Sequence, residues 1–411
     1  MDDIPPDVPN DALRAGAAYA ERLPAKSNPP ELSPDDLSQL QKSYGDSCSK
    51  YERLADGKLH KSDTIIISGY GCALRVKNDA LVIYPGKTHA AQTQATTILY
   101  RGMHSVKHIV LLSDKGVVSL DAVKWANEQD IAVMMLDGRG NLLLSLSTEH
   151  TSDAALRRMQ YHASDTGQDI TIARELVKRK IEAQIDVLKL LPDHPIVAGH
   201  TLVMQGKKVT LKRKGGMEHG DFIWKPLEDA LVELPSAKEI TTIQLVEAQT
   251  ALTYWSCLVG IPIHWKASDV KKIPPHWKRV TKRRERAGSA QHATNPYQAV
   301  TNYAYALLQG QCKQALMATG FDTACGFIHA DQLNRDSLVF DMMEPHRAHV
   351  DRLILHMFAS HVLSKGEFMS TSDGSVQFNP QFARYIAATC RIEQDEIDMS
   401  AEWLKEVVMK R

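Results

Sequence analysis

The sequence lacks the features that mark disulfide-rich, secreted and membrane-spanning proteins. Its six cysteines are scattered over 411 residues and form no Cys-x-x-Cys pair, so we expect free thiols rather than a disulfide scaffold or a structural zinc site. No run of about 18 apolar residues occurs, and no membrane span is expected. The acidic, proline-rich first residues contain no basic region leading into an apolar run, which argues against a secretory signal. We therefore expect a cytoplasmic protein.

The chain also lacks a net charge, because 49 basic and 49 acidic residues cancel. A total of zero does not exclude nucleic acid as a partner, since phosphate groups are bound by local patches of positive charge. Residues 266–286 form such a patch, with 9 bases and 2 acids. Residues 1–60 have the opposite bias, with 7 bases and 11 acids. Contacts to DNA are therefore expected from a segment, not from the chain as a whole.

Changes in composition along the chain predict its domains. Residues 1–61 are rich in proline and acids and predict an N-terminal extension. Residues 62–148 contain short apolar runs punctuated by glycine, which predict a β-rich domain. Residues 149–411 are dominated by helical periodicity, with an alternating pattern at about 198–226 that predicts an inserted β-hairpin. The expected fold class is α+β, with a β-rich domain followed by a mostly α-helical one.

The spacing of apolar residues predicts individual elements. Lys178, Arg179 and Lys180, which lie on one of the predicted helices, are expected on a solvated outer face. The residues after Cys390 are acidic and helical in character, and they are too few for a further DNA-binding domain of ordinary size. Helices are predicted at residues 120–129, 174–191 and 241–259. Strands are predicted at residues 64–67, 72–76, 80–84, 108–112, 131–136 and 141–147.

The stretch from Asn295 to Arg347 organises the rest of the chain. Apolar residues three and four positions apart predict an amphipathic helix that begins through Asn-Pro. A loop punctuated by glycine then delivers His329, and a second helix carries Asp341 and Glu344 on one face. One imidazole and two carboxylates suit a hydrated divalent cation that can meet a phosphate. A capping histidine and solvated carboxylates would explain the same spacing.

The order of the motifs adds information that spacing alone lacks. A helix with the sequence Asn-Pro-Tyr-Gln-Ala-Val-Thr-Asn-Tyr-Ala-Tyr-Ala-Leu-Leu begins at Asn295, a Gly-Phe-Ile-His loop begins at Gly326, and Asp-Met-Met-Glu-Pro-His-Arg begins at Asp341. Upstream, Glu-Ala-x-x-Ala-x-x-Tyr-Trp begins at Glu247. In this order and at this spacing, the motifs resemble those of the CRISPR adaptation integrase family, whose metal-dependent enzymes insert new spacers into CRISPR arrays. The resemblance covers roughly residues 62–390.

The resemblance implies a metal site and a reaction. Glu247, His329 and Glu344 are expected to bind Mg²⁺ or Mn²⁺, with Asp341 as an auxiliary acid. The 3′-hydroxyl of a short DNA attacks a phosphodiester of a target duplex, and water in its place gives nicking. Glu344 stands where many members have Asp, and Gln298 stands where Asn is common.

The resemblance also implies partners. Double-stranded and branched DNA are the expected substrates, and the β-rich domain is expected to build a homodimer. The small dimeric partner protein of the CRISPR adaptation complex is a further expected partner.

Two basic segments are candidates for contact with DNA. The 266–286 segment also contains Trp265 at its edge and Trp277, whose rings could stack on a splayed base or lie in the core of a solvated loop. The predicted hairpin could be a ribbon that touches DNA or a plain surface hairpin. The candidate DNA-binding residues are Lys271, Lys272, Lys278, Arg279, Lys282, Arg283, Arg284, Arg286, Lys212 and Arg213.

Three other functions remain open on the sequence. The extension and the insertion are unusual for the family, which leaves a transposon-encoded integrase of the same family as the second candidate. A DNA-binding scaffold without catalysis is a third, although intact Glu247, His329 and Glu344 argue against it. A tyrosine recombinase would need Tyr303 or Tyr305 as nucleophile, and both are expected in the core because they lie on a packed helix.

Overall fold

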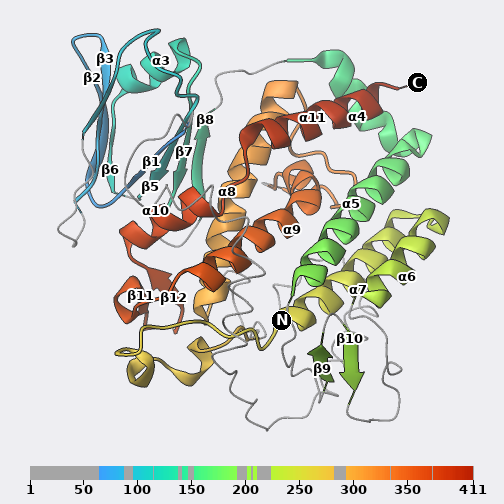
Figure 1. Cartoon of the computed structure of the whole chain (residues 1–411). Coiled ribbons are helices and arrows are strands. Elements are labelled where there is room, and N and C mark those ends of the chain that lie inside the picture. The colour runs from blue at the N-terminus through green and yellow to red at the C-terminus, as the bar shows by residue number, and fades with distance from the viewer. Residues whose placement is uncertain are drawn as a thin grey trace.

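The computed structural model confirms an α+β fold, with strands in the first part of the described chain and mostly helices in the second (Figure 1). The proposed N-terminal extension lies outside the described residues, as do Lys212, Arg213, Lys282, Arg283, Arg284 and Arg286. The structure describes residues 64–87, 96–113, 115–137, 141–146, 152–191, 201–204, 207–210, 224–281, 293–333, 335–372 and 374–410.

The first sheet has the strand order β1-β5-β7-β8. Its strands β1 (Thr64–Ser68), β5 (His108–Leu112) and β7 (Ala132–Leu136) are parallel, and β8 (Leu142–Leu146) pairs antiparallel with β7. Alternate side chains of these strands enter two different cores, because successive residues of a strand point to opposite faces. One face packs against the second sheet and the other against the helices. Burial on both faces explains the uninterrupted apolar runs of these strands.

The second sheet has the order β4-β3-β2-β6, from strands β2 (Cys72–Lys77), β3 (Ala80–Tyr84), β4 (Thr97–Leu99) and β6 (Gly116–Val118). Its inner face shares a core with the first sheet and with α3 (Leu120–Glu128).

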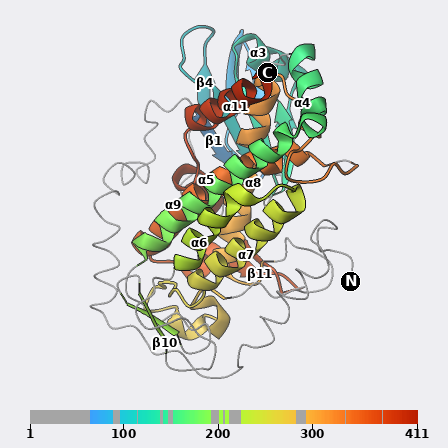
Figure 2. The same cartoon turned by 90° about the vertical axis from the view of Figure 1, so that its right-hand side faces the viewer.

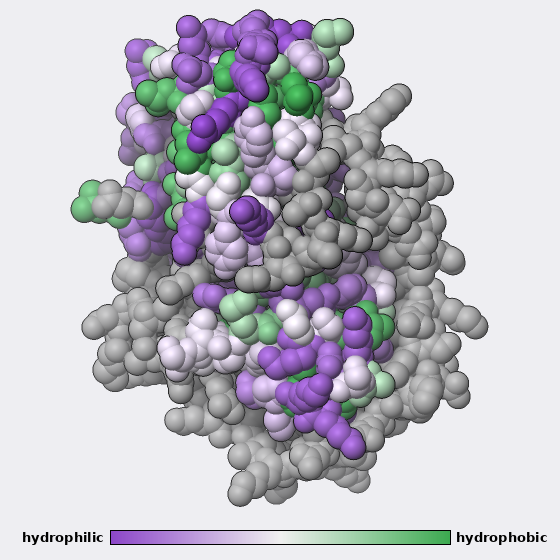
Figure 3. Space-filling model, turned by 90° about the vertical axis from the view of Figure 1, so that its left-hand side faces the viewer, coloured by the Kyte–Doolittle hydropathy of each residue, from purple (hydrophilic) through white to green (hydrophobic). Residues whose placement is uncertain are grey.

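The outer face of the second sheet carries exposed apolar side chains. Tyr84, Ile98 and Val117 are 37%, 48% and 50% exposed, and Met103 and Leu120 nearby are more exposed still. Figure 3 shows the molecule from this side, with apolar (green) residues interspersed among hydrophilic ones over the upper part of the surface. The sheet domain therefore exposes several large apolar side chains to the outside.

The second part of the described chain is built from helices and two small hairpins. Strands β9 (Thr201–Met204) and β10 (Lys207–Thr210) pair antiparallel where a hairpin was predicted, and β11 (Phe368–Ser370) pairs with β12 (Val376–Phe378). The helices are α4 (Ala154–Thr166), α5 (Gln168–Leu190), α6 (Lys225–Glu233), α7 (Ile240–Leu258), α8 (Pro296–Thr319), α9 (Ser337–Ser360), α10 (Pro380–Thr389) and α11 (Gln394–Met409).

Helices α8 and α9 form the centre of this part, and α5 lies beside α9 (Figures 1 and 2). Helix α8 also packs against β7 and β8, so that Met134 and Leu136 of the sheet share one core with the helices. A Cβ on Gly310 would overlap the side chain of Met134. The glycine therefore lets the helix approach the sheet closely.

Helix α11 packs on α8 and α4. Its Ile397, Ala401, Leu404 and Val408 are fully buried at helical spacing. Near its end, Gln168 Nε2 donates a hydrogen bond to the carbonyl of Val407 at 2.7 Å. The last helix is therefore an integral part of the helical core. Among the described residues, no helix is long and apolar enough to cross a membrane.

Candidate active site

Two carboxylates from different helices converge on one buried ammonium group. Lys180 of α5 forms an ion pair with Glu247 of α7, and its Nζ lies 2.5 Å from Oε2 of Glu344 on α9. The side chains of Lys180 and Glu344 are 4% and 3% exposed, whereas that of Glu247 is 25% exposed. The structure thus brings together two of the three expected metal ligands, with a cation already between them.

The expectation that Lys180 faces solvent was wrong. Lys180 is one helical turn from Leu176 and one from Gln184, and all three are buried. Lys178 and Arg179 do lie toward the surface, with side chains 50% and 35% exposed. The three consecutive bases thus do not share a face, because neighbours in a helix point about 100° apart.

Arg347 provides the second positive charge at the site. Its Nη2 lies 3.3 Å from Oε1 of Glu344, and its guanidinium lies 5.4 Å from the ring centre of Tyr305. Burial raises the pKa of Glu344, but Arg347, Lys180 and the ring of His329 outweigh it and hold that pKa well below its usual range. Burial lowers the pKa of Lys180, yet the charges of Glu344 and Glu247 raise it overall. The carboxylate and both cations are therefore charged at neutral pH.

Asp341 fixes the loop that carries His329. Its carboxylate accepts hydrogen bonds from the backbone N–H groups of Phe327, Ile328 and His329, and Oδ1 lies 2.6 Å from Nδ1 of the His329 ring. Asp341 is fully buried. Because both of its oxygens are engaged, the geometry gives Asp341 the part of a positioning residue that leaves Nε2 of His329 available.

The glycine of the Gly-Phe-Ile-His loop is required by close packing. A Cβ on Gly326 would lie 2.6 Å from the carbonyl oxygen of His329 and 3.1 Å from Oδ2 of Asp341. A hydrogen bond from Gln244 Nε2 of α7 to the carbonyl of Ile328, at 2.7 Å, holds the same loop from the other side. The loop is thereby tied to both helices that carry the carboxylates.

A third buried carboxylate, after Glu344 and Asp341, is that of Asp351, one helical turn beyond Arg347 on α9. The hydroxyl groups of Tyr254 and Tyr305 donate to Asp351 at 2.9 and 2.8 Å. Burial raises the pKa of Asp351 to about 6 despite both hydrogen bonds. Sequence reasoning missed Asp351, because its partners Tyr254 and Tyr305 lie far from it in the sequence. The expectation that Tyr303 and Tyr305 belong to the core is confirmed, since Tyr303 is 1% exposed and Tyr305 packs against that core.

The described part of the basic segment forms a loop with its aromatic side chains turned inward. Trp277 is 1% exposed and stacks on Trp265, with 6.1 Å between ring centres. Both rings are therefore core residues, and base stacking by them is not supported. Lys271, Lys272 and Lys278 are exposed and Arg279 is partly exposed.

Asn295 ties this loop to the start of α8. Its Nδ2 donates to the carbonyls of His276 and Arg279, at 2.5 and 2.8 Å, while its Oδ1 caps the helix at Tyr297. Tyr297 in turn packs on Phe358 of α9, with 5.2 Å between ring centres. Phe358 is 14 residues beyond Glu344, so at 1.5 Å per residue this contact lies about 21 Å along α9 from Glu344.

The site has the donor chemistry for a divalent cation. Two carboxylates and an imidazole suit Mg²⁺ or Mn²⁺, and the buried Oε2 of Glu344 has the ammonium of Lys180 directly against it. In the described part of the chain, no three His, Cys, Asp or Glu side chains are arranged closely enough to hold a metal, and Lys180 occupies the point where two of the carboxylates meet. The donor types suit a divalent ion, which would have to take the place of this ammonium.

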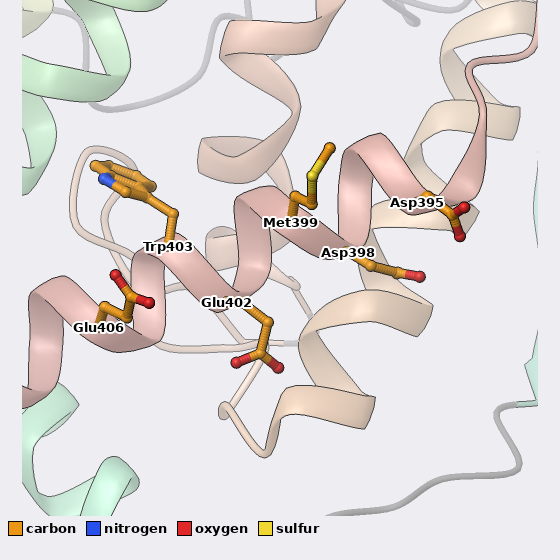
Figure 4. A pocket seen from close by; sticks show the side chains of 6 residues that line it. All are labelled: Asp395, Asp398, Met399, Glu402, Trp403 and Glu406. Atoms are coloured by element: carbon orange, nitrogen blue, oxygen red, sulfur yellow. The ribbon is translucent and has the colours of Figure 1, made fainter.

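A hollow on the surface of α11 contains none of these residues. Figure 4 shows the side chains that line it, several of which are acidic. An acidic lining repels phosphate, so this hollow does not compete as the site of DNA chemistry. The lining residues are Asp395, Asp398, Met399, Glu402, Trp403 and Glu406.

Comparisons with known proteins place these features in a family. The chain is 26% identical to CRISPR-associated endonuclease Cas1 1 of Archaeoglobus fulgidus over 303 residues, which cover 72% of this chain and 78% of the relative. It is 23% identical to CRISPR-associated protein Cas1 3 of Methanobrevibacter ruminantium over 304 residues, or 74% and 80% of the two chains.

Solved structures share the fold. A casposase bound to integration product superposes with a TM-score of 0.64 at 20% identity, covering 85% of this chain and 91% of that one. A Cas1 protein from Thermotoga maritima gives 0.59 at 15% identity, covering 85% and 98%. The model of the family described as CRISPR associated protein Cas1 matches residues 65–390. The chain therefore belongs to the CRISPR-associated Cas1 family.

Proposed function

We propose that this chain is a metal-dependent DNA integrase and endonuclease of CRISPR spacer acquisition. It joins the 3′-hydroxyl ends of a short DNA to a target duplex by transesterification. The observation that carries the proposal is the convergence of Glu247 and Glu344 on one cation position, beside a loop that presents His329. Curated relatives carry the name endonuclease, and the casposase with this fold was solved with an integration product.

Glu247, Glu344 and Nε2 of His329 would hold Mg²⁺ or Mn²⁺. When bound, such an ion supplies Lewis acidity for the scissile phosphate and charge stabilisation for the leaving oxygen. No protein nucleophile is needed, which agrees with the buried position of Tyr303 and the partly buried position of Tyr305.

Asp341 and Arg347 of this chain position and charge the residues that would hold the metal. Asp341 fixes the orientation of the His329 ring through Nδ1, as carboxylates that contact the other ring nitrogen do for histidine ligands. Arg347 lies beside Glu344 and keeps that carboxyl ionised and ready to accept a cation. Residues held in place before the substrate arrives lose little freedom when the reaction proceeds.

The basic loop would bind phosphates of the DNA backbone other than the reacting one. Its candidate DNA-binding residues in the described part are Lys271, Lys272, Lys278 and Arg279. Their loop is tied through Asn295 and Tyr297 to Phe358, which lies well beyond Glu344 on α9, so these residues would contact phosphates at a distance from the reacting one. Backbone neutralisation of this kind does not depend on sequence.

The outer face of the second sheet is the surface that we assign to a homodimer. Its exposed Tyr84 and Val117 flank Ala73 on either side, and Ile98 lies opposite Val82 on the neighbouring strand. Exposed apolar side chains gathered in this way are of the type that subunit interfaces bury. A partner protein is the second expectation. A structure titled Cas6-RT-Cas1–Cas2 complex shares the fold with a TM-score of 0.56 at 14% identity, covering 84% of this chain and 34% of that one.

A transposon-encoded integrase of the same family is the second candidate. The fold likeness to a casposase supports it. The two functions differ in the DNA that they use, because a transposon enzyme joins the ends of its own element whereas a spacer integrase accepts short duplexes of unrelated sequence.

Strand transfer tests the proposal. Purified protein would be mixed with a short 3′-hydroxyl duplex, supercoiled plasmid and Mn²⁺ or Mg²⁺, beside Glu247→Ala and His329→Ala. We expect joining that depends on the metal and that both substitutions abolish. Joining without metal, or joining by both variants, would contradict the proposal. Salt-sensitive DNA binding without joining would favour a scaffold, or a missing partner that addition of that partner would reveal.

A further inference from the structure

The ammonium of Lys180 occupies the position that the proposed metal needs. Glu247 and Glu344 both direct an oxygen at it. Two carboxylates, Lys180 and Arg347 together carry no net formal charge. A divalent ion added beside the ammonium would meet strong repulsion at a few ångströms in a buried site. The metal and the ammonium therefore exclude each other from this point.

The structure contains a place to which the ammonium can move. Gln184 lies one turn further along α5, on the same face as Lys180, and is 4% exposed. Within the described part of the chain, its Oε1 is buried and accepts no hydrogen bond. A buried acceptor without a donor costs free energy, and a lysine ammonium carries three donors.

We propose that Lys180 is a built-in competitor for the metal, which neutralises Glu247 and Glu344 in the metal-free protein and moves to Oε1 of Gln184 when the divalent ion binds. The inference rests on the proposed metal site and adds a residue that sets its affinity. Lys180 is a positioning residue in this scheme, because it acts through the carboxylates.

The competition has two measurable consequences. Only the fraction of molecules in which the ammonium has left the carboxylates binds metal, so the apparent affinity is reduced by that fraction. In addition, the metal-free protein depends on Lys180 to hold two carboxylates side by side, since a buried charge without a partner is destabilising. Removal of the ammonium should therefore tighten metal binding and weaken the metal-free fold.

Mn²⁺ titration followed by the electron paramagnetic resonance signal of the free ion tests this without DNA. We expect Lys180→Gln to bind Mn²⁺ about tenfold more tightly than the wild type. The matched control is Lys178→Gln on the same helix, which pairs only with Glu175 and Glu182 among the described residues, at 3.7 and 3.9 Å, and should leave the affinity unchanged. Thermal unfolding should show a larger shift on adding Mn²⁺ for Lys180→Gln than for the wild type.

A second variant keeps the test decisive if Lys180→Gln does not fold. Gln184→Met retains the volume of the side chain and the ion pairs of Lys180, and it removes the acceptor for the displaced ammonium. We expect it to bind Mn²⁺ at least threefold more weakly, while the metal-free protein is at least as stable as the wild type because a buried acceptor without a donor is removed.

The outcomes separate this inference from the function on which it rests. Equal or weaker Mn²⁺ binding by Lys180→Gln, or unchanged binding by Gln184→Met, would overturn the role of Lys180 alone. A wild type that binds no Mn²⁺, or binds it equally well after Glu247→Gln, would overturn the metal site and this inference with it.

Discussion

Oδ1 of Asp341 lies 2.6 Å from Nδ1 of His329, and the same carboxylate accepts the backbone N–H groups of the loop that carries this histidine. One buried group thus sets both the path of the loop and the direction of the ring. In this way the side chain of a histidine in a loop is held in position as firmly as that of a residue in a helix.

Asp341→Asn should abolish strand transfer and destabilise the fold by about 3 kcal/mol, because an amide N–H would face the buried N–H donors of the loop. Strand-transfer assays and urea unfolding measure the two effects. Asp331→Asn is the matched control, since Asp331 is exposed and accepts only one N–H, that of Gly326, among the described residues, and an amide oxygen can replace it. Equal effects of the two variants would show that Asp341 is not needed to hold the loop that carries His329.

Gly326→Ala should also reduce activity. Its Cβ would lie 2.6 Å from the carbonyl oxygen of His329 and 2.9 Å from Cβ of Ser337, so the loop must shift. We expect a loss of stability of about 2 kcal/mol and a large loss of joining, since such overpacking distorts the backbone. Gly366→Ala is the control, because its added Cβ would have no described atom within 4 Å. An active Gly326→Ala enzyme would show that the loop tolerates displacement.

Asp351 should make stability depend on pH. Burial raises its pKa from 3.8 to about 6, so the stability contributed by the neutral carboxyl is present below about pH 4 and is lost as pH rises through about 6. The loss is on the order of 3 kcal/mol, from 1.36 kcal/mol per pKa unit.

The variant Asp351→Asn carries no charge at either pH and serves as the reference. Its stability relative to the wild type should therefore increase between about pH 4 and about pH 7.5. Urea unfolding of both proteins at the two pH values measures the difference. A difference that is the same at both would show that Asp351 does not titrate in this range.

Lys271 and Lys278 should contribute to affinity for DNA without affecting metal binding. Replacing both by Ala should weaken binding at physiological salt and reduce the slope of log K against log salt by about 2, because each phosphate contact contributes about 0.9. Fluorescence anisotropy at several salt concentrations gives the slope. The control is the replacement by Ala of Lys77 and Lys124, two lysines exposed on the sheet domain. It should leave the slope unchanged. If both pairs behave alike, the basic loop is not a DNA contact.

Much of the fold followed from the sequence because its signals are local. The strands of the first sheet are continuous apolar runs, and α5, α7 and α8 have clear helical periodicity. Asn295 and Pro296 begin α8 as expected, with the Asn side chain as cap.

The surroundings of the site were harder to predict. Lys180 was assigned to the surface as one of three consecutive bases, although its spacing from Leu176 and Gln184 placed it on the buried stripe. Asp351 and the inward positions of Trp265 and Trp277 depend on contacts between segments far apart in the sequence. Such contacts leave no local pattern, because tertiary packing decides them.

Helix α11 lies beyond residue 390, where the match to the family model ends. It nevertheless contacts two of the helices that supply the site, α5 and α9. The ring centre of Trp403 lies 3.7 Å from the guanidinium carbon of Arg179, the neighbour of Lys180, and Glu396 contacts His349 of α9 at 3.1 Å. A shortened chain trimmed at the family boundary would keep every proposed ligand. It would also lose the contacts of α11 with α5 and α9 and expose the apolar residues of α8 that α11 covers. Inactivity of such a chain would therefore say nothing about the ligands themselves.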